Sequence, residues 1–122
     1  MSAPTTGRVI TILGDTSDPS AITGSALRSD LLVHEATFDA SLEGRAVKAG
    51  HSTTLMAAEF ARKVNARRLV ITHFSARYDN PHGSHDKEMN VDKLLEETQK
   101  ACPEIEVIAA KDFLEIEVKK VN

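Results

Sequence analysis

Carboxylate and imidazole side chains occur in four short strings along this chain, and together they could bind a metal ion and move protons. Both groups ligate divalent metals, and imidazole exchanges its proton near neutral pH. In chain order the strings are Gly14-Asp15-Thr16, His34-Glu35-Ala36-Thr37, His51-Ser52-Thr53 and Thr72-His73-Phe74-Ser75. Three of the four end or closely follow an apolar run that is typical of a strand. The strings therefore predict a metal-dependent hydrolase site where a sheet passes into its loops.

The elements that must position these strings alternate between strands and helices. Apolar runs rich in β-branched residues predict strands at 8–13, 30–34, 68–72, 105–109 and 113–118. Helical patterns occur at 19–27, at 39–49 with Gly50 closing the helix, and at 87–101. The clearest helix begins at Ser52 or Thr53, and its apolar stripe consists of Ala57, Phe60, Ala61 and Val64.

This alternation predicts an α/β fold in a single domain, with helices packed on a sheet. The pattern leaves open whether the helices cover one face of the sheet or both. In open α/β sheets, ligands bind beyond the carboxyl ends of the strands. Asp15, His34, Glu35 and His73 all lie at such ends, so the topology and the chemistry indicate the same edge.

Adjacent residues of a strand point to opposite faces, so only one of His34 and Glu35 can reach this edge site. Glu35 could orient a catalytic imidazole and stabilise its protonated form, and His51 is the obvious partner. His51 also precedes the beginning of a helix, where free backbone N–H groups favour an anion such as phosphate. A histidine there could protonate a leaving oxygen.

Each of these residues also has a plainer interpretation. Asp15 could bond its own backbone in a turn, His73 could be a satisfied histidine of the core, and His51 could belong to a simple capping loop. His82 and His85 are three residues apart in a polar stretch with Gly83, which favours a solvated loop over a metal site.

The composition is that of an ordinary globular protein. Of the 122 residues, 41% are hydrophobic and 27% charged, and no apolar run approaches the ~20 residues that cross a bilayer. The polar N-terminus shows no secretory signal, and the lone Cys102 fits a reducing compartment, so we expect an intracellular, cytoplasmic protein, with nucleus or organelle left open. A net charge of −3 gives no global attraction to nucleic acid, so any RNA contact must be local.

As an ordered set, the four strings, extended by Ala76-Arg77-Tyr78, resemble the C-terminal half of ribonuclease Z, the tRNA 3′ endonuclease of the metallo-β-lactamase fold. The resemblance runs strongly from Gly7 to Tyr78 and continues more loosely through 107–110 and 112–113. It implies half of an αββα sandwich, with one mixed sheet and helices packed on one face. It also implies two zinc ions and precursor tRNA as the substrate. Because half a sandwich leaves one apolar sheet face uncovered, we expect a homo-oligomer or a partner that covers it.

The resemblance assigns roles to individual residues. Asp15 corresponds to the aspartate that bridges the two metal ions, and His73 to a histidine ligand of one of them. His51 corresponds to the catalytic histidine, and Glu35 to its carboxylate partner. Ser52, Thr53, Ser75 and Arg77 are the candidate substrate-binding residues.

One part of the family pattern is missing from the sequence. The His-x-His-x-Asp-His string that supplies most of the metal ligands does not occur in these 122 residues. Zinc sites normally have at least three protein ligands, so this chain alone should hold two zinc ions poorly. We therefore expect a fragment or split gene product that self-associates or requires an N-terminal half carrying that string.

Two other functions stay open at this point. The chain could be a non-catalytic subunit that acts through dimerisation, or another hydrolase of the same fold. A nucleotide-binding module is disfavoured because no Gly-x-Gly-x-x-Gly or Walker loop follows a strand.

Overall fold

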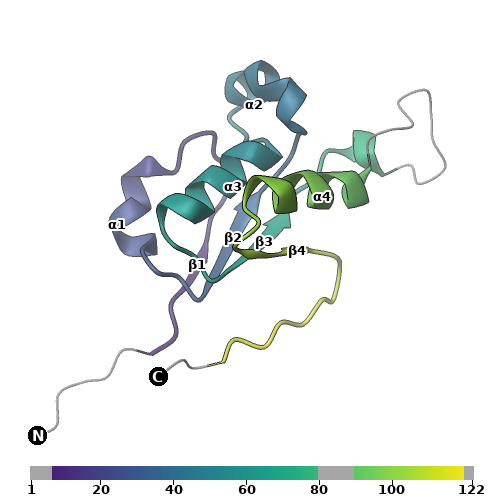
Figure 1. The fold of residues 1–122 in the computed structure, drawn as a ribbon. Helices are drawn as coiled ribbons and strands as arrows, with labels where there is room; N and C mark the ends of the chain where they lie inside the picture. Colours follow the sequence, from purple (N-terminus) through teal and green to yellow (C-terminus); the bar gives the residue numbers. More distant parts are fainter. Residues whose placement is uncertain (1–6, 80–89, 120–122) are drawn as a thin grey trace, which may run out of the picture.

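The computed structural model describes residues 7–79 and 90–119. Four strands form one sheet in the order of the chain. They are β1 (Ile10–Ile12), β2 (Leu31–Glu35), β3 (Arg68–Thr72) and β4 (Glu106–Ala109). Every pairing is parallel, and the register aligns Val33 of β2 with Val70 of β3 and Ile108 of β4. The carboxyl ends of the strands therefore meet at one edge, which we call the carboxyl edge (Figure 1).

The predicted α/β fold is confirmed, but two details of the sheet are wrong. The described strands form a parallel sheet and not a mixed one, and residues 113–118 form no strand. The carbonyls of Glu117 and Val118 instead accept hydrogen bonds from the side chains of Arg68, at 2.7 Å, and Arg8, at 2.5 Å. Guanidinium groups thus occupy backbone acceptors that a neighbouring strand would otherwise use.

Short helical segments connect the strands. After β1 come a 3-10 turn (Ser20–Ile22) and α1 (Thr23–Ala26), and after β2 a 3-10 turn (Ala40–Leu42) and α2 (Glu43–Ala49). The longer helices are α3 (Thr54–Lys63) and α4 (Val91–Ala101). Gly50 ends α2 at a φ of 78°, a left-handed conformation that suits glycine. Among the described residues, no helix is both long enough and apolar enough to cross a membrane.

Side chains cap the beginnings of the two longer helices. Thr53 caps α3 by accepting a hydrogen bond from Met56 N at 3.2 Å, as one of the two predicted caps. Asn90 caps α4 by accepting from Lys93 N at 2.9 Å. The predicted helix at 87–101 is confirmed from Val91 onward. Residues 87–89, and the solvated loop predicted around His82 and His85, lie outside the described residues.

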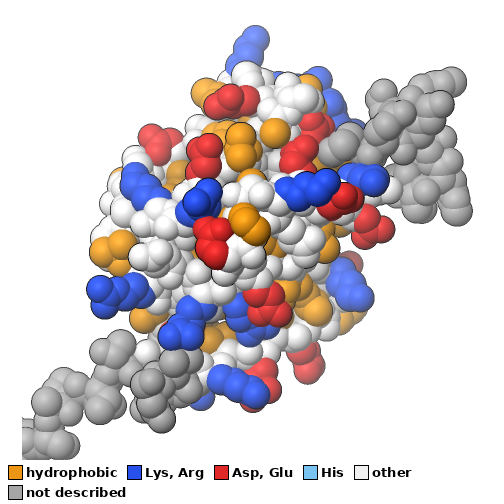
Figure 2. All heavy atoms as spheres, in the orientation of Figure 1, with side chains coloured by type: hydrophobic (Ala, Val, Ile, Leu, Met, Phe, Trp, Pro, Cys, Tyr) orange, Lys and Arg blue, Asp and Glu red, His pale blue; other side chains and the backbone are white. Residues whose placement is uncertain are grey.

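The core lies between the helices and one face of the sheet. The predicted stripe on α3 is buried, with Ala57, Ala61 and Val64 fully so and Phe60 5% exposed. It packs in one cluster with Leu32, Leu69, Ile71 and Val107, which alternate along β2, β3 and β4. In Figure 1, α3 and α4 lie over this same face. The outer surface of the molecule on the side of the helices carries basic and acidic side chains side by side (Figure 2). Arg62 of α3 pairs with Glu104, which follows α4, at 2.8 Å.

The opposite face of the sheet also carries apolar side chains, which are exposed at β1 and covered farther across, where Val70 of β3 is 4% exposed. Ile10 and Ile12 of β1 are 50% and 72% exposed. Farther across this face, residues 114–119 run past Ile108 and border a groove of about 590 Å³. We call this surface, comprising Ile10, Ile12, Val33, Val70 and Ile108, the open face.

Candidate metal and acid-base site

The carboxyl edge brings the four sequence strings together. Asp15 follows β1, Glu35 ends β2, and His73 follows β3. His51 arrives from the loop between α2 and α3. Hydrogen bonds lock that loop to the others: Ser52 Oγ donates to Thr16 O at 2.5 Å, and Thr37 N donates to Ser52 O at 3.0 Å. The prediction that these side chains share one edge is confirmed.

Glu35 and His51 form a hydrogen-bonded pair. Nδ1 of His51 lies 2.9 Å from Oε2 of Glu35 and 3.3 Å from Oε1. The Glu35 side chain is 2% exposed and that of His51 22%. The backbone N–H of Thr16 also donates to Glu35 Oε1 at 2.6 Å. The carboxylate is thus held from several sides, while the imidazole beside it reaches solvent.

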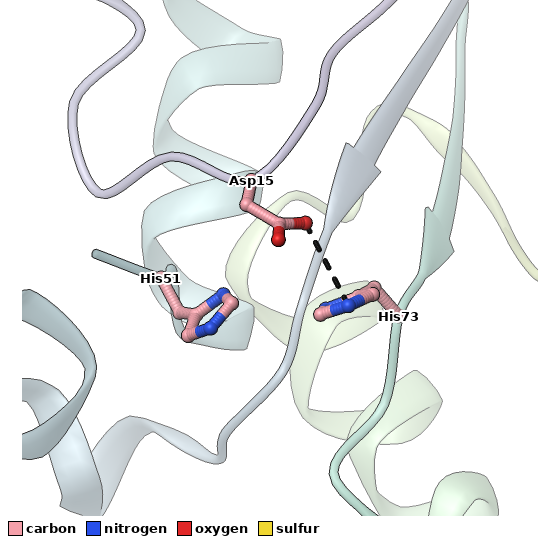
Figure 3. A group of neighbouring side chains, drawn as sticks. All are labelled: Asp15, His51 and His73. Carbon is pink, nitrogen blue, oxygen red and sulfur yellow. Dashed lines mark ion pairs between the residues drawn. The ribbon is translucent and has the colours of Figure 1, made fainter. Parts of the chain in front are cut away.

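Asp15, His51 and His73 form a cluster that could hold a cation. One possible ligand atom from each lies within 4.8 Å of the others. Nε2 of His73 is 3.6 Å from Oδ1 of Asp15; Figure 3 marks this pair with a dashed line. The rings of His51 and His73 stack with centroids 5.3 Å apart. The Asp15 and His73 side chains are 59% and 51% exposed, so both are accessible from solution.

The plainer interpretations of Asp15 and His73 differ from the structure, whereas the capping loop suggested for His51 does form, with Thr53 as the cap of α3. In the described residues the Asx-type turn forms at Asp18, whose Oδ1 accepts from Ser20 N at 3.0 Å, while Asp15 faces His73. His73 is exposed and not a core residue. It has a φ of 60°, a left-handed conformation that is uncommon outside glycine.

His34 and Glu35 point to opposite faces, as the alternation of a strand predicts. His34 is fully buried beside Phe60, with ring centroids 5.9 Å apart. Its Nδ1 lies 2.7 Å from the Glu35 carbonyl, and burial lowers the pKa of this imidazole. His34 therefore belongs to the core, and Glu35 alone reaches the site.

The four candidate substrate-binding residues occupy different environments. Ser52 and Thr53 are buried and bond Thr16 O and Met56 N. Ser75 Oγ accepts from Arg77 N at 3.4 Å. Arg77 is exposed, with its guanidinium 5.4 Å from the centre of the Phe38 ring, and Phe38 meets His51 edge-on at 6.4 Å. Of the four, Arg77 is the most accessible.

Two further residues of the site, Thr37 and Thr16, were not predicted from the sequence. Thr37 is 6% exposed, and its hydroxyl contacts both Glu35 and His73. Thr16 holds Glu35 through its backbone. The signal for Thr37 was available, because residues two apart on a strand share a face. The role of Thr16 depends on the path of a loop and has no such signal.

Solved structures with similar folds define the class of protein. The metallo-beta-lactamase fold protein YhfI from Bacillus subtilis matches 84% of this chain with a TM-score of 0.63 and 27% identity, over 36% of its own length. The short form of human tRNase Z matches 92% with a TM-score of 0.66 and 36% identity, over 34% of its length. The chain therefore has part of a metallo-β-lactamase fold.

Proteins of similar sequence indicate which members of this class the chain resembles. Ribonuclease BN of Cronobacter sakazakii is 43% identical over 119 residues, which is 97% of this chain and 36% of that protein. Ribonuclease Z of Listeria monocytogenes is 47% identical over 76 residues, 62% of this chain and 25% of that protein. No family model matches the chain. The chain is thus similar in sequence to part of ribonucleases Z and BN, and it spans a quarter to about a third of the length of the first relatives it matches.

Proposed function

We propose that this chain supplies part of the active site of a zinc-dependent endoribonuclease that removes the 3′ trailer of precursor tRNA. The observation that carries the proposal is the Glu35–His51 pair, at 2.9 Å, beside the Asp15–His73 pair. An acid-base pair next to potential metal ligands is an arrangement well suited to phosphodiester hydrolysis. The names of the relatives, ribonuclease Z, ribonuclease BN and tRNase Z, support this activity.

In this proposal Asp15 and His73 hold the metal. Their fit is supported by the donor set itself, a carboxylate and an imidazole that both face solvent with donor atoms 3.6 Å apart. Bound zinc would supply a Lewis acid that stabilises charge on phosphate and lowers the pKa of a water molecule. His51 also lies within reach of the same cation. We assign it to proton transfer because the resemblance gives the histidine of this string the catalytic role, and Glu35, bonded to its Nδ1, can stabilise the imidazolium.

The proton moves through His51. The Glu35 carboxylate accepts a hydrogen bond from Nδ1 and stabilises the imidazolium, so Nε2 can hold the proton that the leaving oxygen takes. Arg77, exposed and stacked on Phe38 beside His51, can approach a substrate phosphate. Ser75 supports the backbone of Arg77. Ser52 and Thr53 contribute by shaping the loop that carries His51.

The partner in this proposal is an N-terminal half that carries His-x-His-x-Asp-His, or a second copy of the chain. Asp15 and His73 are fewer than the three protein ligands that a zinc site normally has. The open face, with Ile12 72% exposed, is the apolar surface that such a partner would cover. The expected homo-oligomer belongs to the same proposal.

Complementation tests the proposal. The chain is mixed with a polypeptide bearing His-x-His-x-Asp-His, zinc and a precursor tRNA labelled in its 3′ trailer, and release of the trailer is measured. We expect cleavage, with His51→Ala lowering the rate by about 10²–10⁴-fold, and Lys48→Ala, an exposed change at the end of α2, leaving it unchanged. An unchanged rate in His51→Ala refutes the catalytic role. Well below one zinc per chain, with no rescue by the partner, favours a non-catalytic subunit.

A further inference from the structure

We propose that Thr37 is a positioning residue whose hydroxyl connects the Glu35 carboxylate to His73 through hydrogen bonds, a connection we call the relay. The relay fixes which nitrogen of the His73 ring carries the proton. Thr37 lies between the two residues at the carboxyl edge and is 6% exposed. The inference concerns the chain's own hydrogen bonds. Its functional meaning rests on the metal role proposed for His73.

The Thr37 hydroxyl has three polar neighbours. Oγ1 is hydrogen-bonded to Glu35 Oε2, lies 3.0 Å from Nδ1 of His73, and lies 2.8 Å from the His73 carbonyl oxygen. Glu35 Oε2 itself is 3.9 Å from His73 Nδ1, beyond direct hydrogen-bond distance. The hydroxyl is therefore the group that connects the carboxylate to the ring.

A hydroxyl has a single proton to donate, and its neighbours determine where the proton goes. If the proton pointed at Nδ1, the hydroxyl oxygen would face the carboxylate and the carbonyl with no proton between them. The carboxylate is the stronger acceptor because it is charged. The hydroxyl proton therefore goes to an oxygen, and the Thr37 lone pairs face His73. Nδ1 of His73 must then be the protonated nitrogen, donating to Thr37.

This tautomer leaves the lone pair of His73 on Nε2, the nitrogen that lies 3.6 Å from Asp15 Oδ1. A lone pair is what a metal ligand needs, and a hydrogen bond at the opposite ring nitrogen is the usual way to hold it in place. His51 is bonded through Nδ1 to the same Glu35 carboxylate. A single buried carboxylate thus directs both rings, one directly and one through Thr37.

The backbone of Thr37 holds the hydroxyl in position. Its N–H donates to Ser52 O at 3.0 Å, and its C=O accepts from Ser75 N at 3.0 Å. Thr37 is therefore joined to the loop of His51 on one side and to the loop of His73 on the other. These constraints place the hydroxyl where the relay needs it.

The test compares Thr37→Val, which removes the hydroxyl and keeps the shape, with Thr37→Ser, which keeps the hydroxyl. Histidine-labelled chain without metal is observed at pH 8 by long-range ¹⁵N–¹H correlation, and His73→Ala identifies the His73 signals. We expect one Nδ1–H tautomer of His73 in the unchanged chain and in Thr37→Ser, and a mixture of tautomers in Thr37→Val. Thr98→Val is the matched control, because Thr98 is fully buried and its hydroxyl donates to Leu94 O within α4. Its spectrum should match that of the unchanged chain.

Zinc affinity gives a second readout. We expect Thr37→Val to weaken zinc binding about 10–100-fold, and Thr37→Ser to retain it. A pure Nδ1–H tautomer in Thr37→Val overturns the inference, and Thr37→Ala provides the same comparison if Thr37→Val does not fold. If the unchanged chain binds no zinc even with its partner half, the proposed metal role fails. The tautomer measurement still decides the relay.

Discussion

The Glu35 carboxylate lies 2.9 Å from Nδ1 of His51, although 16 residues separate them in the chain. The strand β2 ends at Glu35, and α2 and its Gly50 turn return the chain to the same edge. Glu35 is almost fully buried while His51 is partly exposed. The geometry therefore pairs a fixed acceptor with a ring that can reach a substrate.

This pairing predicts that Glu35 and His51 act as a unit. In the complemented enzyme we expect Glu35→Gln to slow cleavage markedly, since the amide no longer stabilises the imidazolium. The double variant Glu35→Gln/His51→Ala should lose much less than the sum of the two single losses, because Glu35 acts mainly through the His51 ring and otherwise only through Thr37 on His73. Rates for both single variants and the double variant measure this. Glu59→Gln, on the exposed side of α3, is the control, and additive losses would show that Glu35 acts independently.

The surroundings of Tyr78 predict that the stability of the folded chain depends on pH. Its hydroxyl donates to Asp39 Oδ2 at 2.7 Å and accepts from Asp39 N at 2.8 Å. Burial, followed by the hydrogen bond to Asp39, raises the pKa of Tyr78 from 10.0 to about 12. Because the folded chain holds this proton more tightly, the stabilisation is complete below pH 10 and is lost as the pH rises toward 12. We expect urea unfolding to show this loss in the unchanged chain and not in Tyr78→Phe.

Two controls accompany the Tyr78 prediction. At pH 7, Tyr78→Phe should lower the free energy of unfolding by about 1–2 kcal/mol, because the carboxylate and the backbone N–H of Asp39 lose the hydroxyl that they bond. The chain has one tyrosine, so the phenolate absorbance of the folded protein reports Tyr78 alone. Titration of that absorbance near pH 10 would contradict the prediction.

The sequence predicted much of the fold and of the candidate site, because local patterns determine those parts. The apolar run of β3 predicted its bounds, 68–72, and the alternation at His34 and Glu35 predicted that only one of the two reaches the site. The failures involve partners distant in sequence. Residues 113–118 alternate like a strand, but a strand needs a neighbour to pair with, and here arginine side chains take the carbonyls of Glu117 and Val118. The left-handed φ of His73 likewise depends on its surroundings.

Glu97 links α4 to the elements around the site through hydrogen bonds, and we expect this link to stabilise the fold. Its Oε1 accepts hydrogen bonds from Ala40 N, at 2.8 Å, and from the buried Thr54 hydroxyl at the start of α3. We expect Glu97→Ala to lower the free energy of unfolding by about 1–3 kcal/mol, since both donors lose their acceptor. The neighbouring Glu96 is exposed and, within residues 7–79 and 90–119, pairs with Lys93 and Lys100. Glu96→Ala is therefore the matched control, and an equal loss in both variants would contradict the link.

The open face predicts how the chain associates. Ile12 is 72% exposed and begins a row of β-branched residues that the register continues through Val33, Val70 and Ile108. We expect the unchanged chain to self-associate in sedimentation velocity, and Ile12→Glu to reduce this. Since Ile12 is exposed in the chain alone, the change should leave its urea unfolding nearly unaltered. Burying the new carboxylate beneath a partner is costly, so complementation of tRNA cleavage should be lost.

Val47→Glu is the matched control for Ile12→Glu. Val47 is 52% exposed on α2, so the substitution introduces the same charge at a comparably exposed apolar position away from the sheet. It should leave both self-association and complementation unchanged. If Ile12→Glu complements as well as the unchanged chain does, the partner does not cover β1. If the unchanged chain is a sharply folding monomer at every concentration, the open face does not drive self-association, and the homo-oligomer fails with it.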